Sequence, residues 1–356
     1  MASGCKRGCR NIVVVALLLL LGAAAFGAWM WQRYDRFADR PIAGLRADDN
    51  VMVESGDSFA KVLRKLRQHG ASEGSDLEWQ LLARCMDAAG RLKVGEYALQ
   101  PGLTPRRLLQ DMRDGKVVQH RVTLVEGWNI RQVRAVLKNA TPLLQKTAQM
   151  DDAELMAALG HAGQHPEGRF LPETYVYTRG ESDLDVLRRA HDAMDKALAT
   201  AWRDRAVDLP LGSADEALIL ASIIEKETGN ADERRQIAGV FVRRLKLGMK
   251  LQTDPTVIYG LGSNYDGNIR RADLLADTPY NTYTRTGLPP TPIAMPGRAS
   301  LQAAVDPADG DALYFVALGD GSGRHAFTAS LDEHNAAVAR YLQQLRAARQ
   351  KEANKQ

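Results

Sequence analysis

The sequence predicts an α+β protein with a single N-terminal transmembrane helix, a small α/β module and then a larger mixed α+β domain. Three observations lead to this prediction. An uncharged run lies near the start of the chain, short strand-like and helical patterns alternate up to residue 116, and longer amphipathic helices separated by loops follow. A chain of 356 residues is long enough for two or three domains with buried cores.

The run from residue 11 to 32, NIVVVALLLLLGAAAFGAWMWQ, contains no charged side chain. A helix of this length is about 30 Å long, the thickness of a bilayer core. Lys6, Arg7 and Arg10 precede it, so the positive-inside rule places residues 1–10 in the cytoplasm and the rest of the chain outside. A cleaved signal peptide is the competing interpretation, but its apolar region would be shorter and would end in small residues rather than in WMWQRY.

The segment 33–47 predicts a linker, because mixed charges, Pro41 and Gly44 leave no periodicity. A module from 48 to 116 follows. Its patterns predict a strand at 51–53, a helix from 59 to 70 capped by Asp57 or Ser58, a helix at 76–90, a strand in KVGEYALQPG and a helix capped by Thr104. The module contains no cluster of potential catalytic groups, so binding or spacing is its expected role.

The domain predicted from 117 to 342 is richer in helices, and a solvated tail from 343 to 356 ends the chain. Ser213 and Glu216 predict a capping box for a helix that stops near Gly229. The other predicted elements are a strand at 123–125, a helix capped by Asn129, helices at 152–160, 183–207 and 236–247, a long polar loop at 252–298, and a final strand, strand and helix.

Charge and cysteine usage exclude some classes of protein. The net charge is +4, and no long Lys/Arg run or aromatic–basic stripe accompanies it, so nucleic acid is not an expected partner. Cys85 is the only cysteine beyond the apolar run, so no intramolecular disulfide is available there. This suits a bacterial envelope protein with a core large enough to fold without disulfides.

A carboxylate follows an almost wholly apolar stretch in LILASIIEKETGN, residues 218–230. Nearly every position from 217 to 224 is apolar, so both faces of this helix are expected to be buried. A carboxyl group at the edge of such surroundings has a raised pKa, which a general acid near neutral pH requires. We therefore predict Glu225 as the acid, with Lys226 and Glu227 pointing elsewhere; the alternative is an exposed, ion-paired Glu225.

The loop from 252 to 298 is too rich in ring and hydrogen-bonding side chains for an ordinary linker. Tyrosine rings pack on sugar faces and amides pair with hydroxyl groups, so a carbohydrate cleft is predicted, with a rigid structural loop as the alternative. The substrate-binding candidates are Gln252, Asp254, Tyr259, Asn281 and Tyr283.

Two histidine-containing segments are candidate sites. His161 and His165 stand one helical turn apart, but without a clustered third ligand no metal site is predicted. His325, Glu333 and Asn335 belong to a polar group near the end of the chain that either lines the cleft or caps the last helix.

Several long motifs, in order, resemble those of the YceG-like (MltG) family of endolytic murein transglycosylases: GEYALQPG, VTLVEGWNIRQV, EGRFLPETY, LILASIIEKET, LQTDPTVIYG, TPYNTYTRTGLPPTPIAMPG and HAFTASLDEHN. The similarity covers residues 48–342. The sequence departs from the family at Val125, where proline is frequent, and at Glu173, where aspartate is commoner.

The resemblance implies cleavage of the β-1,4 bond between N-acetylmuramic acid and N-acetylglucosamine inside peptidoglycan strands, with formation of 1,6-anhydro ends and no cofactor. It places the family's glutamate on Glu225 and makes the module at 48–116 LysM-like. For Glu173, which departs from the family pattern, we predict a second carboxylate near the cleft that orients rather than protonates. The resemblance also implies a single-pass protein of the bacterial inner membrane, with its enzymatic part in the periplasm, that contacts penicillin-binding synthases and limits strand length.

Two other classes of function stay open. A peptidoglycan hydrolase would need a base to activate water, for which Asp254 and Glu173 are the candidates. A non-catalytic peptidoglycan-binding scaffold would tolerate Glu225→Gln.

Overall fold

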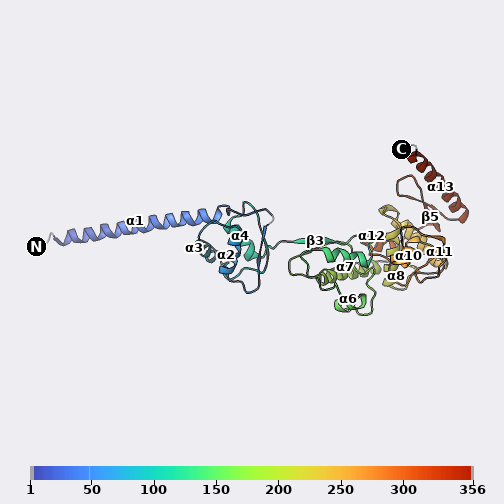
Figure 1. The fold of residues 1–356 in the computed structure, drawn as a ribbon, viewed down its shortest axis with the longest axis horizontal. Helices are drawn as coiled ribbons and strands as arrows, with labels where there is room; N and C mark the ends of the chain where they lie inside the picture. Colours follow the sequence, from blue (N-terminus) through green and yellow to red (C-terminus); the bar gives the residue numbers. More distant parts are fainter. Residues whose placement is uncertain (1–3, 48, 354–356) are drawn as a thin grey trace. The chain divides into compact units, whose positions relative to one another are not determined.

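The computed structural model describes residues 4–47 and 49–353. The first residues of the predicted segment 1–10, the first residue of the predicted module and the end of the predicted tail 343–356 lie outside the described residues. The chain divides into two compact units, 1–120 with 178–180, and 121–177 with 181–356 (Figure 1).

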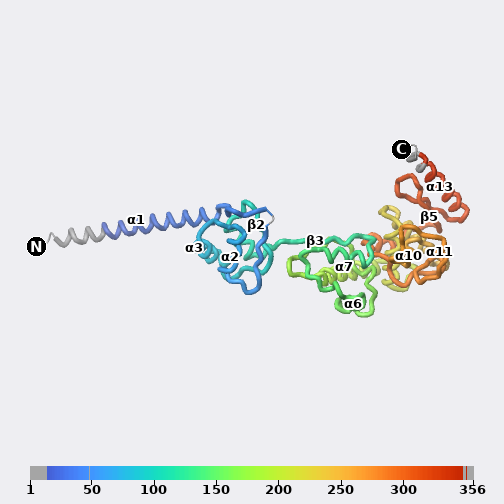
Figure 2. Tube along the Cα trace, viewed as in Figure 1, coloured from blue at the N-terminus to red at the C-terminus, as the bar shows by residue number. Residues whose placement is uncertain are grey.

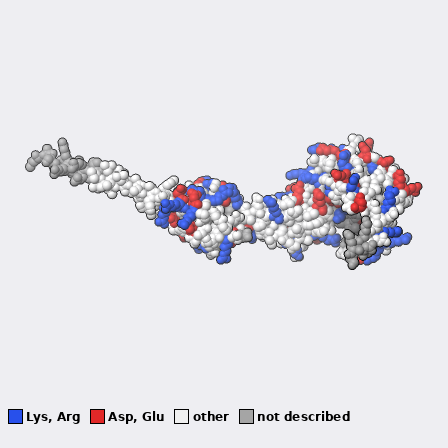
Figure 3. All heavy atoms as spheres, turned by 90° about the horizontal axis from the view of Figure 1, so that it is seen from above, with Lys and Arg blue, Asp and Glu red and all other residues white. Residues whose placement is uncertain are grey.

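The first helix, α1 (Gly4–Asp39), includes the apolar run. In the described part of the chain it is the one helix long and apolar enough to cross a membrane. Figure 3 shows the described side chains of its apolar part, from Val14 onward, mostly as white spheres, whereas blue and red side chains mix over the compact part of the same unit. The segment 33–47 differs from the predicted linker, because α1 continues to Asp39 and buries Phe37 and Ala38. The ring of Phe37 packs edge-on against Trp79, with centroids 5.5 Å apart.

The rest of the first unit is a two-stranded antiparallel sheet covered by three short helices. Its elements are β1 (Asp49–Val53), α2 (Phe59–Gln68), α3 (Asp76–Cys85), β2 (Gly95–Leu99) and α4 (Pro105–Asp114). Asp49 pairs with Leu99 and Val53 with Gly95. Ser58 rather than Asp57 caps α2, and α3 is shorter than predicted because the chain turns at Met86. Trp79, Tyr97 and the apolar faces of the helices form the core.

The second unit is mostly helical. Its helices are α5 (Ile130–Asn139), α6 (Asp152–Leu159), α7 (Asp183–Arg203), α8 (Ala214–Glu227), α9 (Arg234–Lys246), α10 (Asp254–Leu261), α11 (Arg271–Leu275), α12 (Arg298–Val305) and α13 (Leu331–Ala353), with two short 3₁₀ turns, η1 (Ala231–Glu233) and η2 (Gly262–Asn264). Its strands form two small sheets, β3 (His120–Thr123) with β4 (Thr174–Tyr177), and β5 (Tyr314–Ala317) antiparallel to β6 (His325–Thr328).

Helix α8 is the centre of the second unit. It contacts α7, α9, α10 and α12, and every residue from Ala217 to Ile224 is buried. An apolar helix surrounded on all sides is the arrangement that its sequence predicts. The long passage 252–298 contains α10 and α11 where a continuous loop was expected, and it winds around these two helices in the gold-to-orange part of Figure 2.

Candidate active site

The position of α8 is set at its first turn. The Ser213 side chain accepts a hydrogen bond from the Glu216 amide at 3.2 Å, as the predicted cap requires. In the predicted capping box the Glu216 carboxylate would accept a hydrogen bond from the amide of Ser213. It accepts one from the amide of Gly212 instead, at 2.6 Å. The helix ends at Thr228, and its last turn carries Glu225 and Glu227, two residues apart.

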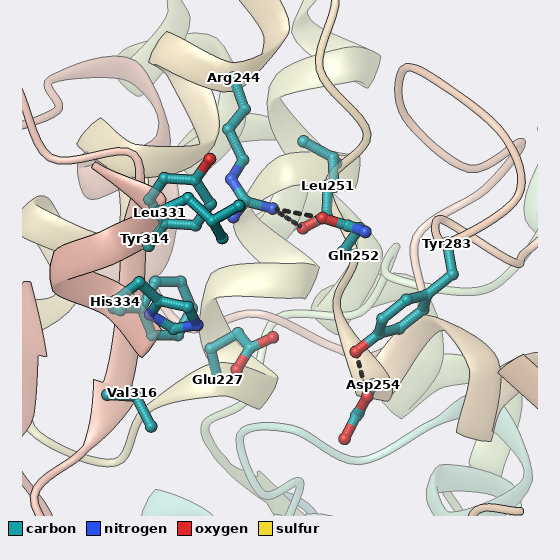
Figure 4. Close-up of a pocket in the computed structure, with 11 residues that line it drawn as sticks. Glu227, Arg244, Leu251, Gln252, Asp254, Tyr283, Tyr314, Val316, Leu331 and His334 are labelled. Atoms are coloured by element: carbon teal, nitrogen blue, oxygen red, sulfur yellow. Dashed lines mark hydrogen bonds between the residues drawn. The ribbon is translucent and has the colours of Figure 1, made fainter. Parts of the chain in front are cut away.

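Glu227 lies in a polar pocket of about 490 Å³, together with Asp254 and His334 (Figure 4). The hydroxyl of Thr253 donates a hydrogen bond to Oε1 of Glu227. Burial raises the pKa of Glu227 to about 7; the bond from Thr253 opposes this rise, and the charge of Asp254 adds to it. A carboxyl group with this pKa carries a proton for much of the time at neutral pH, as a general acid must.

The wall that carries Asp254 begins at Gln252. Gln252 has a φ of +51°, in the left-handed region, and its amide donates to the carbonyl of Thr282 at 3.1 Å. Asp254 is the first residue of α10 and accepts a hydrogen bond from the Tyr283 hydroxyl at 2.5 Å. The passage 252–298 therefore lines the pocket from two of its segments, which Figure 4 shows meeting at Tyr283 and Asp254.

The facing wall of the pocket, formed by Arg244, Tyr314 and His334, was not predicted from the sequence. Arg244 from α9 donates hydrogen bonds from Nε to the Leu313 carbonyl at 2.7 Å and from Nη1 to the Leu251 carbonyl at 2.9 Å. Its guanidinium group stands 5.0 Å from the ring centre of Tyr314, which stacks on His334 at 5.2 Å. The one sequence signal was an arginine within an otherwise buried face of α9.

The structure does not bring Glu225 to this pocket. Its carboxylate accepts the Gly297 amide at 2.9 Å and lies 3.8 Å from the Arg234 guanidinium group, with 6% of the side chain exposed. Burial, and then the nearby Glu225, raise the pKa of Glu126, the third charged group of this cluster. Glu227 rather than Glu225 lines this pocket, and the two side chains point in different directions because two helical residues separate them by about 200°. The catalytic role of Glu225 stays a prediction.

The other predicted site residues divide into two groups. Gln252, Asp254 and Tyr283 line the pocket with Glu227. Asn281 is buried and fixes the loop instead, since its side-chain amide donates to the carbonyls of Asp273, Leu274 and Ala276. Tyr259 lines a separate cavity of about 370 Å³ beside Lys226.

The remaining candidates do not line the pocket. Glu173 is ion-paired with Arg298 at 2.9 Å on the surface. His325 is held by Glu233 at 2.8 Å, and its charge acts on Glu227 only from a distance, by lowering the pKa of that group. Glu333 accepts the Ala329 and Ser330 amides at the start of α13, and Asn335 is exposed on the same helix. Two roles were predicted for this polar group, lining the cleft or capping the last helix, and Glu333 makes the hydrogen bonds of a helix cap.

Comparisons with known proteins all point to one protein family. Residues 51–340 match the model of the YceG-like family. The chain is 31% identical to the endolytic murein transglycosylase of Bacillus subtilis (strain 168), over 82% of this chain and 84% of that protein. It is 26% identical to the endolytic murein transglycosylase of Streptococcus pneumoniae serotype 2, over 92% of this chain and 65% of that protein.

A solved structure is also similar. The crystal structure of a putative yceG-like protein from Listeria monocytogenes superposes with a TM-score of 0.53 and 31% sequence identity, over 81% of this chain and 98% of that one. Together with the family match over most of its length, this shows that the chain is a member of the YceG-like family.

Proposed function

We propose that this protein is an endolytic murein transglycosylase that cleaves glycan strands of peptidoglycan. The names of the relatives from Bacillus subtilis and Streptococcus pneumoniae support the activity and the substrate. The observation that carries the mechanism is the half-buried Glu227, with a pKa of about 7, in a polar pocket. Sugar hydroxyl groups match the carboxylate, amide and phenol groups that line it.

One carboxyl group suffices for this reaction. Glu227 gives its proton to the glycosidic oxygen as the bond from that oxygen to C1 of the muramyl residue breaks. The resulting carboxylate takes the proton of the C6 hydroxyl group as its oxygen bonds to C1, which gives a 1,6-anhydro end and returns Glu227 to its starting state. No water is consumed, so the second carboxylate of an ordinary glycosidase is not required.

Hydrolysis is the competing reaction of the same pocket. Its base would be Asp254, because Glu227 and Asp254 are the two carboxylates of the described residues that line the pocket, while Glu173 is engaged with Arg298 outside it. Asp254 accepts the hydrogen bond from the Tyr283 hydroxyl, so one oxygen of that carboxylate is already engaged. The chemical form of the product end separates the two reactions.

The test is mass spectrometry of fragments released from peptidoglycan by the full chain and by Glu227→Gln and Glu225→Gln. We expect 1,6-anhydromuramyl ends from the wild type, none from Glu227→Gln, and the same ends from Glu225→Gln. Circular dichroism of both variants verifies folding. Reducing ends would show a hydrolase; activity that survives in Glu227→Gln but not in Glu225→Gln would return the acid to Glu225; activity in neither wild type nor variants would favour a scaffold.

The proposed setting is the bacterial inner membrane. Lys6, Arg7 and Arg10 ahead of the apolar part of α1 support a cytoplasmic N-terminus and a periplasmic pocket. The order strand, helix, helix, strand from β1 to β2 supports a LysM-like module that binds or positions glycan. Labelling of single introduced cysteines at each end of the chain by a membrane-impermeant thiol reagent tests the orientation; labelling of the N-terminal site in intact cells would contradict it.

A membrane-anchored enzyme of this kind meets strands while they are polymerised. We therefore propose contact with penicillin-binding synthases and a role in limiting strand length. Site-specific photocrosslinking from exposed positions of α2 and α13 in growing cells tests the contact. Crosslinks to a synthase from one of these surfaces are expected, and their absence from both would count against it.

A further inference from the structure

Three potential metal ligands meet in the second unit, outside the pocket of Glu227. His161 directly follows the cap of α6, and His191 and Asp195 stand one turn apart on α7. One ligand atom from each lies within 4.8 Å of the other two. The two imidazole rings stack, with centroids 3.9 Å apart.

His191 has no other evident role. It is 1% exposed, and neither ring nitrogen has a hydrogen-bond partner among the residues that the structure describes. Nδ1 lies 3.4 Å from Oδ2 of Asp195, in a geometry that does not make a hydrogen bond. A buried imidazole that leaves both nitrogens unpaired is unfavourable unless something binds them.

We propose that His161, His191 and Asp195 form a binding site for a single Zn²⁺ ion, with water as the fourth ligand. Two imidazole nitrogens and one carboxylate oxygen are a ligand set that zinc prefers. The ion would join the end of α6 to the middle of α7 and so stabilise this part of the unit.

Positive charge close to the cluster is already paired. The guanidinium group of Arg169, whose charge acts on His191, forms an ion pair with Asp215 at 2.8 Å.

Metal binding requires only a small contraction of the cluster. Bonds of about 2.0–2.2 Å in a tetrahedron place ligand atoms about 3.4 Å apart, less than the 4.8 Å limit within which they lie here. Asp195 has 45% of its side chain exposed and His161 is half-buried, so these two side chains can approach the fixed ring of His191. His165 is not a ligand, because its Nδ1 accepts the Glu167 amide at 3.1 Å.

Calorimetric titration of the full chain in detergent with ZnCl₂ tests the site, in a background with the three cysteines changed to serine so that no thiol competes. One ion per chain is expected. Asp195→Asn and His161→Gln should each weaken binding at least about tenfold. The matched controls are Asp192→Asn, which removes a nearby charge but no ligand, and His165→Gln; both should bind within about twofold of the parent.

A second readout keeps the test independent of peptidoglycan cleavage. Zinc should raise the thermal unfolding temperature of the parent and of Glu227→Gln, but not of Asp195→Asn. The test uses variants of His161 and Asp195, because replacement of the buried His191 would threaten folding. Absence of stoichiometric binding, or equal affinity in Asp195→Asn, His161→Gln and the controls, would overturn the proposal.

Discussion

The Tyr283 hydroxyl donates a hydrogen bond to Oδ1 of Asp254 at 2.5 Å, in the pocket that Glu227 also lines (Figure 4). This bond fixes the carboxylate of Asp254 at the start of α10. From there its negative charge contributes to the raised pKa of Glu227, after the larger effect of burial. The two carboxylates therefore have different roles: one carries a proton, and the other helps to keep it there.

Asp254→Asn should move the alkaline limb of the pH–activity profile to lower pH. The acid must be protonated to act, so kcat/KM falls as the pH rises through the pKa of Glu227, at about 7. Removal of the neighbouring charge lowers that pKa and the limb follows it. Profiles of kcat/KM for both proteins provide the measurement, with Asp277→Asn, an exposed partner of Arg285, as control. An unmoved limb, or one moved upward, contradicts this role of Asp254.

Glu227→Gln should stabilise the fold at about pH 8 and leave it unchanged near pH 4. The folded-state pKa of about 7 lies above the ordinary 4.5, so the unfolded chain releases this proton first as the pH rises. The wild type therefore loses stability as the pH rises from 4.5 to about 7, whereas the variant does not, and the difference between them reaches at most about 3 kcal/mol above pH 7. Urea unfolding of both proteins at the two pH values measures it. The same difference between variant and wild type at both would contradict the raised pKa.

The sequence predicted α8 well because its signals are local. Ser213 provides the cap, the buried stretch provides the core, and the helix ends close to the predicted Gly229. The same burial explains why the sequence did not indicate which of Glu225 and Glu227 lines the pocket. When all faces of a helix are apolar, periodicity no longer indicates which side of its last turn faces a cleft.

The passage 252–298 shows a different limit. Its composition indicated a polar site, and Gln252, Asp254 and Tyr283 do line the pocket. Asn281 has the same chemistry but is used to bind backbone carbonyls within the loop. Composition alone cannot separate a side chain that binds ligand from one that satisfies buried backbone groups.

The facing wall could not be predicted from any local pattern. Arg244, Tyr314 and His334 come from α9, β5 and α13, and only the tertiary fold brings them together. The His161–His191 pair has the same origin: the sequence offered His165 as the neighbour of His161, whereas the fold supplies a ring from α7.

Gly297→Ala should displace the side chain of Glu126 at small cost. A Cβ atom there would lie 1.8 Å from Oε1 of Glu126, but 48% of that side chain is exposed and it can swing aside, so the backbone keeps the bond from its amide to Glu225. We expect a loss of at most about 1 kcal/mol in the free energy of unfolding. Chemical denaturation of the variant and of Gly229→Ala, where a Cβ would meet nothing within 4 Å, provides the comparison.

A double variant shows whether this clash is the cause. Glu126→Ala removes the atoms that the new methyl group would meet, so Gly297→Ala should cost less in that background. Equal costs in the two backgrounds would mean that the loss has another origin.

Arg244→Lys should reduce both stability and activity although the charge is kept. The guanidinium group donates to the Leu313 and Leu251 carbonyls and stands over Tyr314, whereas an ammonium group cannot make these contacts together. Buried carbonyls left without donors cost about 1–3 kcal/mol each, and the pocket wall loses its support. Arg235→Lys is the control, because Arg235 is exposed and donates to a single carbonyl, that of Asp306. The measurements are the unfolding midpoint and kcat of the two variants. If Arg244→Lys shows the same midpoint and kcat as Arg235→Lys, Arg244 does not support the pocket wall.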